Sequence, residues 1–166
     1  ANTTLLSDTT EITLERPVQY RYKGAWVGTE KQKHVSVLPL VSVTMTPSVV
    51  VFPSRSANKS RPVSVSTSYN GQHSDSSGTL RLEAPLGWTV SPPTSTLSFT
   101  RKNQAVSTQF LLTPPNNVTS GTYKIRAVFS TAGNEFSEGV QKITYHHTHT
   151  RYLYHPAEAK VQALDL

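Results

Sequence analysis

Apolar side chains recur at every second position through most of this 166-residue sequence. Tyr123, Ile125, Ala127 and Phe129 give the clearest example, and the stretches 63–69, 80–84 and 106–112 repeat the pattern. Such alternation places every second side chain on one face of a β-strand. No segment of ten or more residues shows a convincing period of 3.6. The closest is Pro156–Leu166, whose apolar residues fit either a helix or the first strand of a following domain.

Turn-forming residues separate these alternating stretches at nearly regular intervals. They are residues 54–60, Asn70-Gly71, Pro85–Gly87, Pro92-Pro93, Pro114–Asn117 and Gly133-Asn134. Short strands with turn signals at this spacing are typical of antiparallel sandwiches. The sequence therefore predicts an all-β fold with two antiparallel sheets packed face to face.

We divide the chain into three parts. Residues 1–40 are expected to hold two or three strands, including Val18–Tyr22 and Val35–Leu38, as a linker from a preceding domain. Residues 41–145 form the sandwich, and residues 146–166 are a C-terminal extension. The sequence opens without Met and without the features of a signal peptide, so we expect a fragment of a longer protein.

Composition limits the chemistry that the chain can carry. It contains no cysteine, which excludes disulfides and thiolate metal sites. No apolar run approaches the roughly 20 residues of a membrane-spanning helix, so no membrane span is expected. The sequence also lacks the Gly-x-Ser-x-Gly element of many hydrolases and the glycine-rich loops that bind phosphate.

The net charge of +6 is unevenly distributed. Residues 31–74 and 84–134 contain nine basic residues and no acid. Such a surface attracts polyanions, including acidic glycans. The basic residues are scattered singly, without a compact block or a nucleic-acid motif, so no nucleic-acid partner is expected.

Tyr123 begins the strongest strand, directly after a loop rich in Pro and Asn. In immunoglobulin-like sandwiches a Tyr at this point folds its hydroxyl back onto upstream backbone. We therefore interpret Tyr123 as a structural residue of an immunoglobulin-like fold.

Three further aromatic residues allow two interpretations each. Trp88, between two turns, fits a cap on the core or a platform on which a sugar ring stacks. Tyr22 and Trp26 fit a glycan-binding surface or an interface with a neighbouring domain, and Tyr20 must share a face with Tyr22. Trp26, Tyr22 and Trp88 are thus the candidate carbohydrate-binding residues.

Four histidines lie between residues 146 and 155. On a strand, His147 and His149 share a face and are weak candidates for binding one Zn²⁺. A zinc site needs a third ligand, and only Glu158 and Asp165 are near in sequence. We therefore predict no catalytic residue, no metal site and no cofactor.

Residues 41–145 resemble a known family. The elements Pro-Leu-Gly-Trp-Thr-Val-Ser-Pro (85–92), Phe-Leu-Leu-Thr-Pro-Pro (110–115) and Gly-Thr-Tyr-Lys-Ile-Arg-Ala (121–127) are similar to the immunoglobulin-like module associated with bacterial glycoside hydrolases such as α-galactosidases. That resemblance implies an ancillary sandwich without an active site.

The flanking segments resemble a second group. Residues 17–22 and 143–157 look like the region downstream of the catalytic domain in large, secreted PIG-L-type (LmbE-like) N-acetylglucosaminyl deacetylase homologues. The zinc site of that family uses a His-Pro-Asp-Asp element, whereas this chain has His155-Pro156-Ala157-Glu158 and lacks both aspartates. No metal-binding role is therefore transferred.

The sequence predicts a non-catalytic accessory module of a larger secreted or periplasmic carbohydrate-active protein. Its expected partners are the neighbouring domains of the same polypeptide. The alternative is a carbohydrate-binding module that stacks exposed aromatic rings on a polysaccharide or cell-surface glycan, with basic residues selecting acidic polymers.

Overall fold

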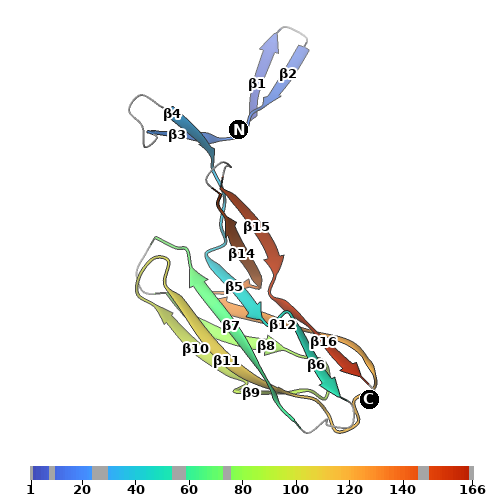
Figure 1. Cartoon of the computed structure of the whole chain (residues 1–166). Helices are drawn as coiled ribbons and strands as arrows, with labels where there is room; N and C mark the ends of the chain where they lie inside the picture. The colour runs from blue at the N-terminus through green and yellow to red at the C-terminus, as the bar shows by residue number, and fades with distance from the viewer. Residues whose placement is uncertain are drawn as a thin grey trace. The chain divides into compact units, whose positions relative to one another are not determined.

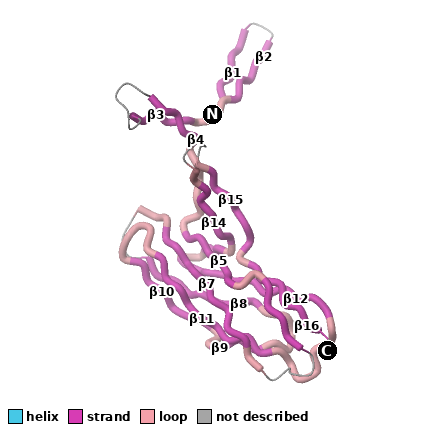
Figure 2. The backbone as a smooth tube through the Cα atoms, in the orientation of Figure 1, coloured by secondary structure: helices cyan, strands magenta, loops and turns pink. Residues whose placement is uncertain are grey.

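The computed structural model describes residues 2–7, 10–23, 30–53, 59–72, 76–145 and 150–164. Strands make up most of the described backbone (Figure 2). The chain divides into two compact units. We call residues 1–37 and 144–150 the hairpin unit, and residues 38–143 and 151–166 the sandwich unit.

The hairpin unit contains two antiparallel hairpins. Strand β1 (Asn2–Ser7) pairs with β2 (Thr10–Glu15), and β3 (Gln19–Lys23) pairs with β4 (Glu30–His34). The backbone N–H of Val35 donates to the carbonyl of Val18, which continues the second ladder by one pair. The sequence predicted a strand at Val35–Leu38, whereas the observed strand β4 precedes it.

The sandwich unit begins with two strands that belong to different sheets. Strand β5 (Val41–Thr46) pairs with β7 (Arg61–Tyr69), whereas β6 (Val49–Pro53) pairs in parallel with β16 (Glu158–Leu164). Pro47 lies between β5 and β6 and has no backbone N–H to donate to a ladder. The chain therefore leaves one sheet at this proline and enters the other.

Two sheets form the sandwich (Figure 1). The four-stranded sheet has the order β5-β7-β11-β9, and the larger sheet has the order β10-β8-β12-β16-β6 with β13 paired to β12. The remaining bounds are β8 (Ser76–Glu83), β9 (Thr89–Ser91), β10 (Thr94–Phe99), β11 (Ala105–Thr113), β12 (Gly121–Thr131) and β13 (Asn134–Phe136). This division confirms the predicted immunoglobulin-like sandwich.

The core lies between the two sheets. Its large, fully buried side chains include four phenylalanines, namely Phe52, Phe99, Phe110 and Phe129. The ring of Tyr69 stacks on Phe99 at 5.5 Å, and Phe99 meets the ring of Phe129 edge-on at 5.8 Å. Among described residues, no buried side-chain polar atom lacks a hydrogen-bond partner. The sandwich thus has a core of its own.

The C-terminal segment differs from the sequence-based division, which placed residues 146–166 outside the sandwich. Strand β16 lies between β12 and β6, and it buries Ala159, Val161 and Ala163. The buried residues of β16 alternate as those of a strand do. Because most of them are alanines, the sequence pattern is weak and also fits a helix. At the other boundary, Asn70 bonds to the carbonyls of Pro39 and Leu40, so residues 38–40 also belong with the sandwich.

Strands β14 (Glu138–Ile143) and β15 (Arg151–Pro156) form a further antiparallel hairpin of the sandwich unit. Gly139 of β14 lies so close to β5 that an added Cβ would approach the carbonyl oxygen of Val43 to 2.8 Å. Only a residue without a side chain allows this approach.

Candidate functional site

Trp88 packs against the apolar core at one end of the sandwich. Its indole meets the ring of Phe52 edge-on at 5.3 Å and lies 5.5 Å from the tilted ring of Tyr123. The side chain is partly buried, and Pro85 accepts a hydrogen bond from the backbone N–H of Trp88. Two aromatic neighbours therefore occupy much of the surface that a sugar ring would need.

Tyr123 connects the start of β12 to the preceding loop. Its hydroxyl donates to the backbone carbonyl of Thr119 at 2.9 Å, and the Thr119 hydroxyl lies 2.7 Å from the phenolic oxygen of Tyr123. The phenolic group has one proton, which it donates to the carbonyl. The Thr119 hydroxyl is therefore the donor in its bond to the phenolic oxygen. This is the geometry of a tyrosine corner.

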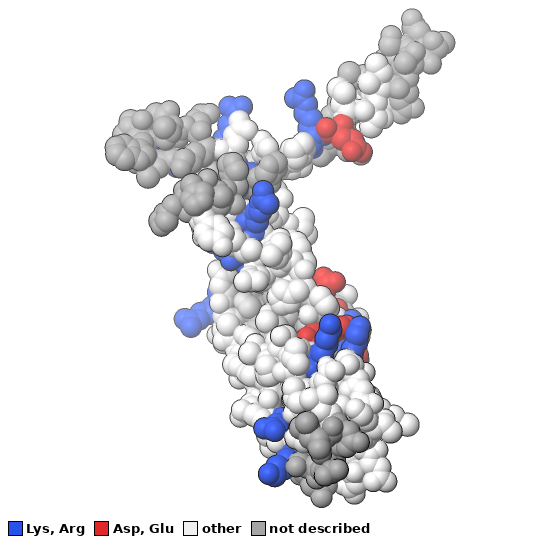
Figure 3. Space-filling view, turned by 45° about the vertical axis from the view of Figure 1, so that its right-hand side comes forward, with Lys and Arg blue, Asp and Glu red and all other residues white. Residues whose placement is uncertain are grey.

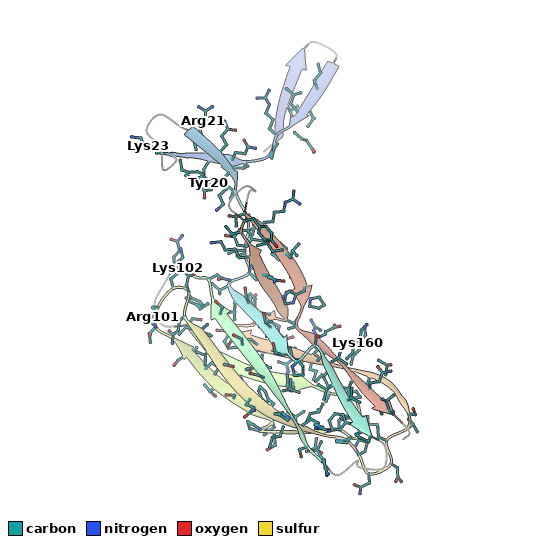
Figure 4. All side chains as sticks on the ribbon, viewed as in Figure 1. Tyr20, Arg21, Lys23, Arg101, Lys102 and Lys160 are labelled. Carbon is teal, nitrogen blue, oxygen red and sulfur yellow. The ribbon has the colours of Figure 1, made fainter. Side chains whose placement is uncertain are left out.

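Tyr20 and Tyr22 lie on one face of β3, with ring centroids 6.0 Å apart and ring planes at 41°. Both remain exposed, at 47% and 43%. Figure 4 labels Tyr20 and Arg21 on opposite sides of this hairpin, as strand alternation requires. Among the candidate glycan-binding residues, Tyr22 is thus exposed and has an aromatic neighbour.

The remaining candidates lie outside the described residues. They are Trp26 and the histidines His147 and His149. Of the cluster, His155 is described; it lies on β15, where its Nδ1 is 3.5 Å from the carbonyl of Pro156. In the described part of the chain, no group of three His, Asp or Glu side chains converges as a metal site would require.

The outer face of the larger sheet carries an ion-pair network. The guanidinium of Arg81 on β8 donates to Glu83 and Glu135, both at 2.9 Å, and to the hydroxyl of Ser130 at 2.7 Å. The hydrogen bond that Arg81 donates to Glu135, and less strongly the one to Glu83, raises the pKa of Arg81, and the bond from Arg81 lowers the pKa of Glu135 below its ordinary value. Figure 3 shows acidic and basic side chains close together on the sandwich. The network is solvated and joins three strands.

The described surface of the sandwich unit includes two depressions that contain polar side chains. The larger, of about 360 Å³, is lined by Ser48, Val49, Lys124, Pro156, Glu158, Ala159 and Lys160. The smaller, of about 140 Å³, is lined by Pro39 and residues 135–138. In the smaller depression, Glu135 and Ser137 accept hydrogen bonds from Arg81 and Arg126, and in the larger one the Lys124 ammonium lies 3.9 Å from the Glu158 carboxylate.

Sequence reasoning missed the neighbours of the exposed tyrosines. In the β3–β4 register, Tyr20 lies opposite Lys33 and Tyr22 opposite Lys31. Alternation placed the two tyrosines together, but the opposing residues follow only from the register. The Arg81–Glu135 pair joins residues 54 positions apart and leaves no local signal in the sequence.

Comparison with known families gives one match. Residues 56–131 match the model of the NPCBM-associated, NEW3 domain of alpha-galactosidase. The matched segment contains β7 through β12 and thus much of both sheets. It supports an accessory β-sandwich module. No curated protein sequence matches the chain.

Several solved structures resemble the chain at low sequence identity. The periplasmic chaperone SfaE is 10% identical, with a TM-score of 0.41; the match covers 75% of this chain and 57% of that one. The PapD-like domain 7 of human CEP192 is 9% identical, with 86% and 99% covered and a TM-score of 0.41. A family 123 glycoside hydrolase from Clostridium perfringens is 8% identical, with 77% and 28% covered and a TM-score of 0.44. Similarities this low carry no functional argument.

The described residues include no helix that is long and apolar enough to cross a membrane.

Proposed function

We propose that this chain is a non-catalytic accessory module of a larger secreted or periplasmic carbohydrate-active protein, and that it packs against and positions neighbouring domains. One observation carries the proposal. A sandwich with its own core is joined in the same chain to hairpins whose apolar side chains are exposed.

The exposed side chains of the hairpin unit form strand faces. Ile12 and Leu14 share a face of β2 and are 51% and 44% exposed, and Val37, which follows β4 outside any strand, is 82% exposed. A two-stranded hairpin is at best marginally stable in water on its own. Because Ile12 and Leu14 are already about half buried, burying the rest of each side chain against another domain would contribute roughly 1 kcal/mol. A neighbouring domain is therefore the partner that best fits these strands.

The identity of the parent protein follows from resemblance. The match of residues 56–131 to a domain of alpha-galactosidase supports a carbohydrate-active context. The segments 17–22 and 143–157 favour a PIG-L-type (LmbE-like) deacetylase as the parent. In that protein the catalytic zinc would belong to another domain, and this chain would supply rigidity and contact surface.

The proposal is tested in the full-length natural polypeptide with the double variant Ile12→Asp/Leu14→Asp. Charge in a buried interface is costly, so we expect the neighbouring domain to melt several degrees earlier and to become sensitive to protease. N-acetylglucosaminyl deacetylase activity is measured in parallel and should fall at elevated temperature. The matched control is Leu86→Asp, which changes a fully exposed leucine on the sandwich.

Two results would contradict the proposal. If the hairpin variant melts and resists protease like the control, β2 makes no contact with a neighbour. If the wild-type polypeptide deacetylates no N-acetylated glycan, the parent is not a deacetylase, whatever the packing result.

A further inference from the structure

The β3–β4 hairpin carries an aromatic face bordered by positive charge. Residues directly opposite each other in an antiparallel pair share a face, with Cβ atoms about 5 Å apart. Lys33 therefore lies beside Tyr20, and in the same register the backbone of residue 31 lies opposite that of Tyr22. Val18 and Val35 extend this face and are 54% and 52% exposed.

The hairpin is also strongly cationic. Its two strands contain the basic residues Arg21, Lys23, Lys31 and Lys33 against the single acid Glu30, a net charge of +3. Strand alternation places Arg21 and Lys23 on the face opposite the tyrosines, and Figure 4 shows Arg21 on the other side of the hairpin from Tyr20. A polyanion that follows the aromatic face would therefore meet positive potential from both sides of the sheet.

We propose that the Tyr20–Tyr22 face binds an acidic polysaccharide. The exposed rings and the flanking valines offer a surface for the C–H faces of successive sugar rings, and the phenolic hydroxyls can exchange hydrogen bonds with sugar hydroxyls. Lys33 and the net positive charge of the hairpin favour polymers whose sugars carry carboxylates. A basic, aromatic surface also suits single-stranded nucleic acid. A glycan is favoured here because the inference rests on the proposed carbohydrate-active context.

Packing and binding use different residues of the hairpin unit. The packing proposal concerns Ile12 and Leu14 on β2, whereas the binding face lies on β3 and β4. Binding is measured on the 166-residue chain alone, without a neighbouring domain. Failure of one proposal is thus distinguishable from failure of the other.

The experiment measures binding of the 166-residue chain to three immobilised polymers at low and high salt. They are polygalacturonic acid, the same polymer with its carboxyl groups reduced to alcohols, and single-stranded poly(dT). We expect clear binding to the carboxylated polymer, at least about tenfold weaker binding to the reduced polymer, and loss of affinity as salt screens the charges.

Variants then assign binding to the hairpin face. Tyr20→Thr/Tyr22→Thr removes the rings and keeps residues that favour strands, whereas Tyr20→Phe/Tyr22→Phe keeps the rings. We expect the Thr variant to bind at least about tenfold more weakly and the Phe variant to retain most affinity. Lys33→Gln should weaken binding, while the matched changes Lys160→Gln and Tyr154→Ser on the sandwich should have no effect.

Several outcomes would overturn the inference. They are absence of binding, equal binding to the reduced polymer, tighter binding to poly(dT), full affinity of the Thr variant, or a loss of affinity in the Phe variant as large as that expected of the Thr variant. Equal losses in Lys33→Gln and Lys160→Gln would indicate a diffuse charge effect and would also refute it.

Discussion

The two units of this chain use the same strand pattern with opposite results. In the sandwich unit, alternate side chains meet those of a second sheet and become fully buried, as Phe110, Ile125 and Val161 do. In the hairpin unit, alternate residues such as Leu14 and Tyr20 stay about half exposed, and the described residues of that unit form no second sheet over them. Alternation thus specifies a strand face, but burial requires a partner for that face. The free energy of unfolding should therefore depend mainly on the sandwich unit, whereas contacts with a neighbouring domain or a glycan should depend on the hairpin unit.

The largest expected effect comes from the sandwich core. Phe129→Ala removes a fully buried ring that contacts Phe99, and it should cost about 3–5 kcal/mol of unfolding free energy. Urea denaturation of the purified chain measures this loss. Tyr22→Ala in the hairpin unit is the comparison and should change stability by less than about 0.5 kcal/mol. Similar losses for the two variants would mean that the hairpin unit has a hidden core.

The next effect tests the close approach of β14 to β5. Gly139→Ala places a methyl group against the backbone of Val43 and the imidazole of His155, and we expect a loss of about 1–3 kcal/mol. Gly121→Ala is the matched control, because nothing lies within 4 Å of its added Cβ. Thermal denaturation compares the melting temperatures of the two variants. Equal melting temperatures would show that β14 is loosely packed against β5.

A smaller effect concerns the tyrosine corner. Tyr123→Phe keeps the ring beside Trp88 but removes the hydroxyl that bonds to Thr119, so about 1 kcal/mol should be lost. Tyr20→Phe deletes a hydroxyl from the hairpin unit and should leave stability unchanged within about 0.5 kcal/mol. Chemical denaturation measures the free energy of unfolding of both variants. If the Tyr123→Phe variant is as stable as the wild type, the tyrosine corner does not contribute to stability.

The smallest effect is a pH dependence from the exposed Arg81 network. Because the Arg81 hydrogen bond lowers the pKa of Glu135 in the folded state below the ordinary 4.5, its stabilisation is present above pH 4.5. This stabilisation is lost as the pH falls through the pKa that Glu135 has in the folded state, which lies below 4.5. Wild type should therefore lose slightly more stability on acidification below pH 4.5 than Glu135→Gln does. Parallel pH dependences of the two melting curves would contradict this role for Glu135.

Sequence reasoning predicted the fold better than its boundaries. Strands β7, β8, β11 and β12 coincide with the alternating stretches, because their inward residues are large and apolar. Strand β16 was assigned outside the sandwich, because alanine is only weakly apolar and its inward face is mostly alanine. The four hairpin strands were only partly predicted, because exposed strands lack the contrast between buried and solvated positions.

The candidate site was predictable to the extent that it depends on local spacing. Residues two apart on a strand share a face, which paired Tyr20 with Tyr22. The flanking lysines depend on which residues of β4 face β3, and neither strand alone specifies that register in the sequence. The surroundings of Trp88 could not be predicted, because Phe52 and Tyr123 reach it from distant parts of the chain.

The parallel pairing of β6 with β16 sets an order of events during synthesis. The ribosome makes β6 early, but the strand that hydrogen-bonds to it emerges only at the end of the unit. Until then Val49 and Val51 lie on an open, uncharged edge that other nascent chains can join. Premature termination before residue 158 would leave that edge permanently unpaired, so truncated products should be prone to aggregation.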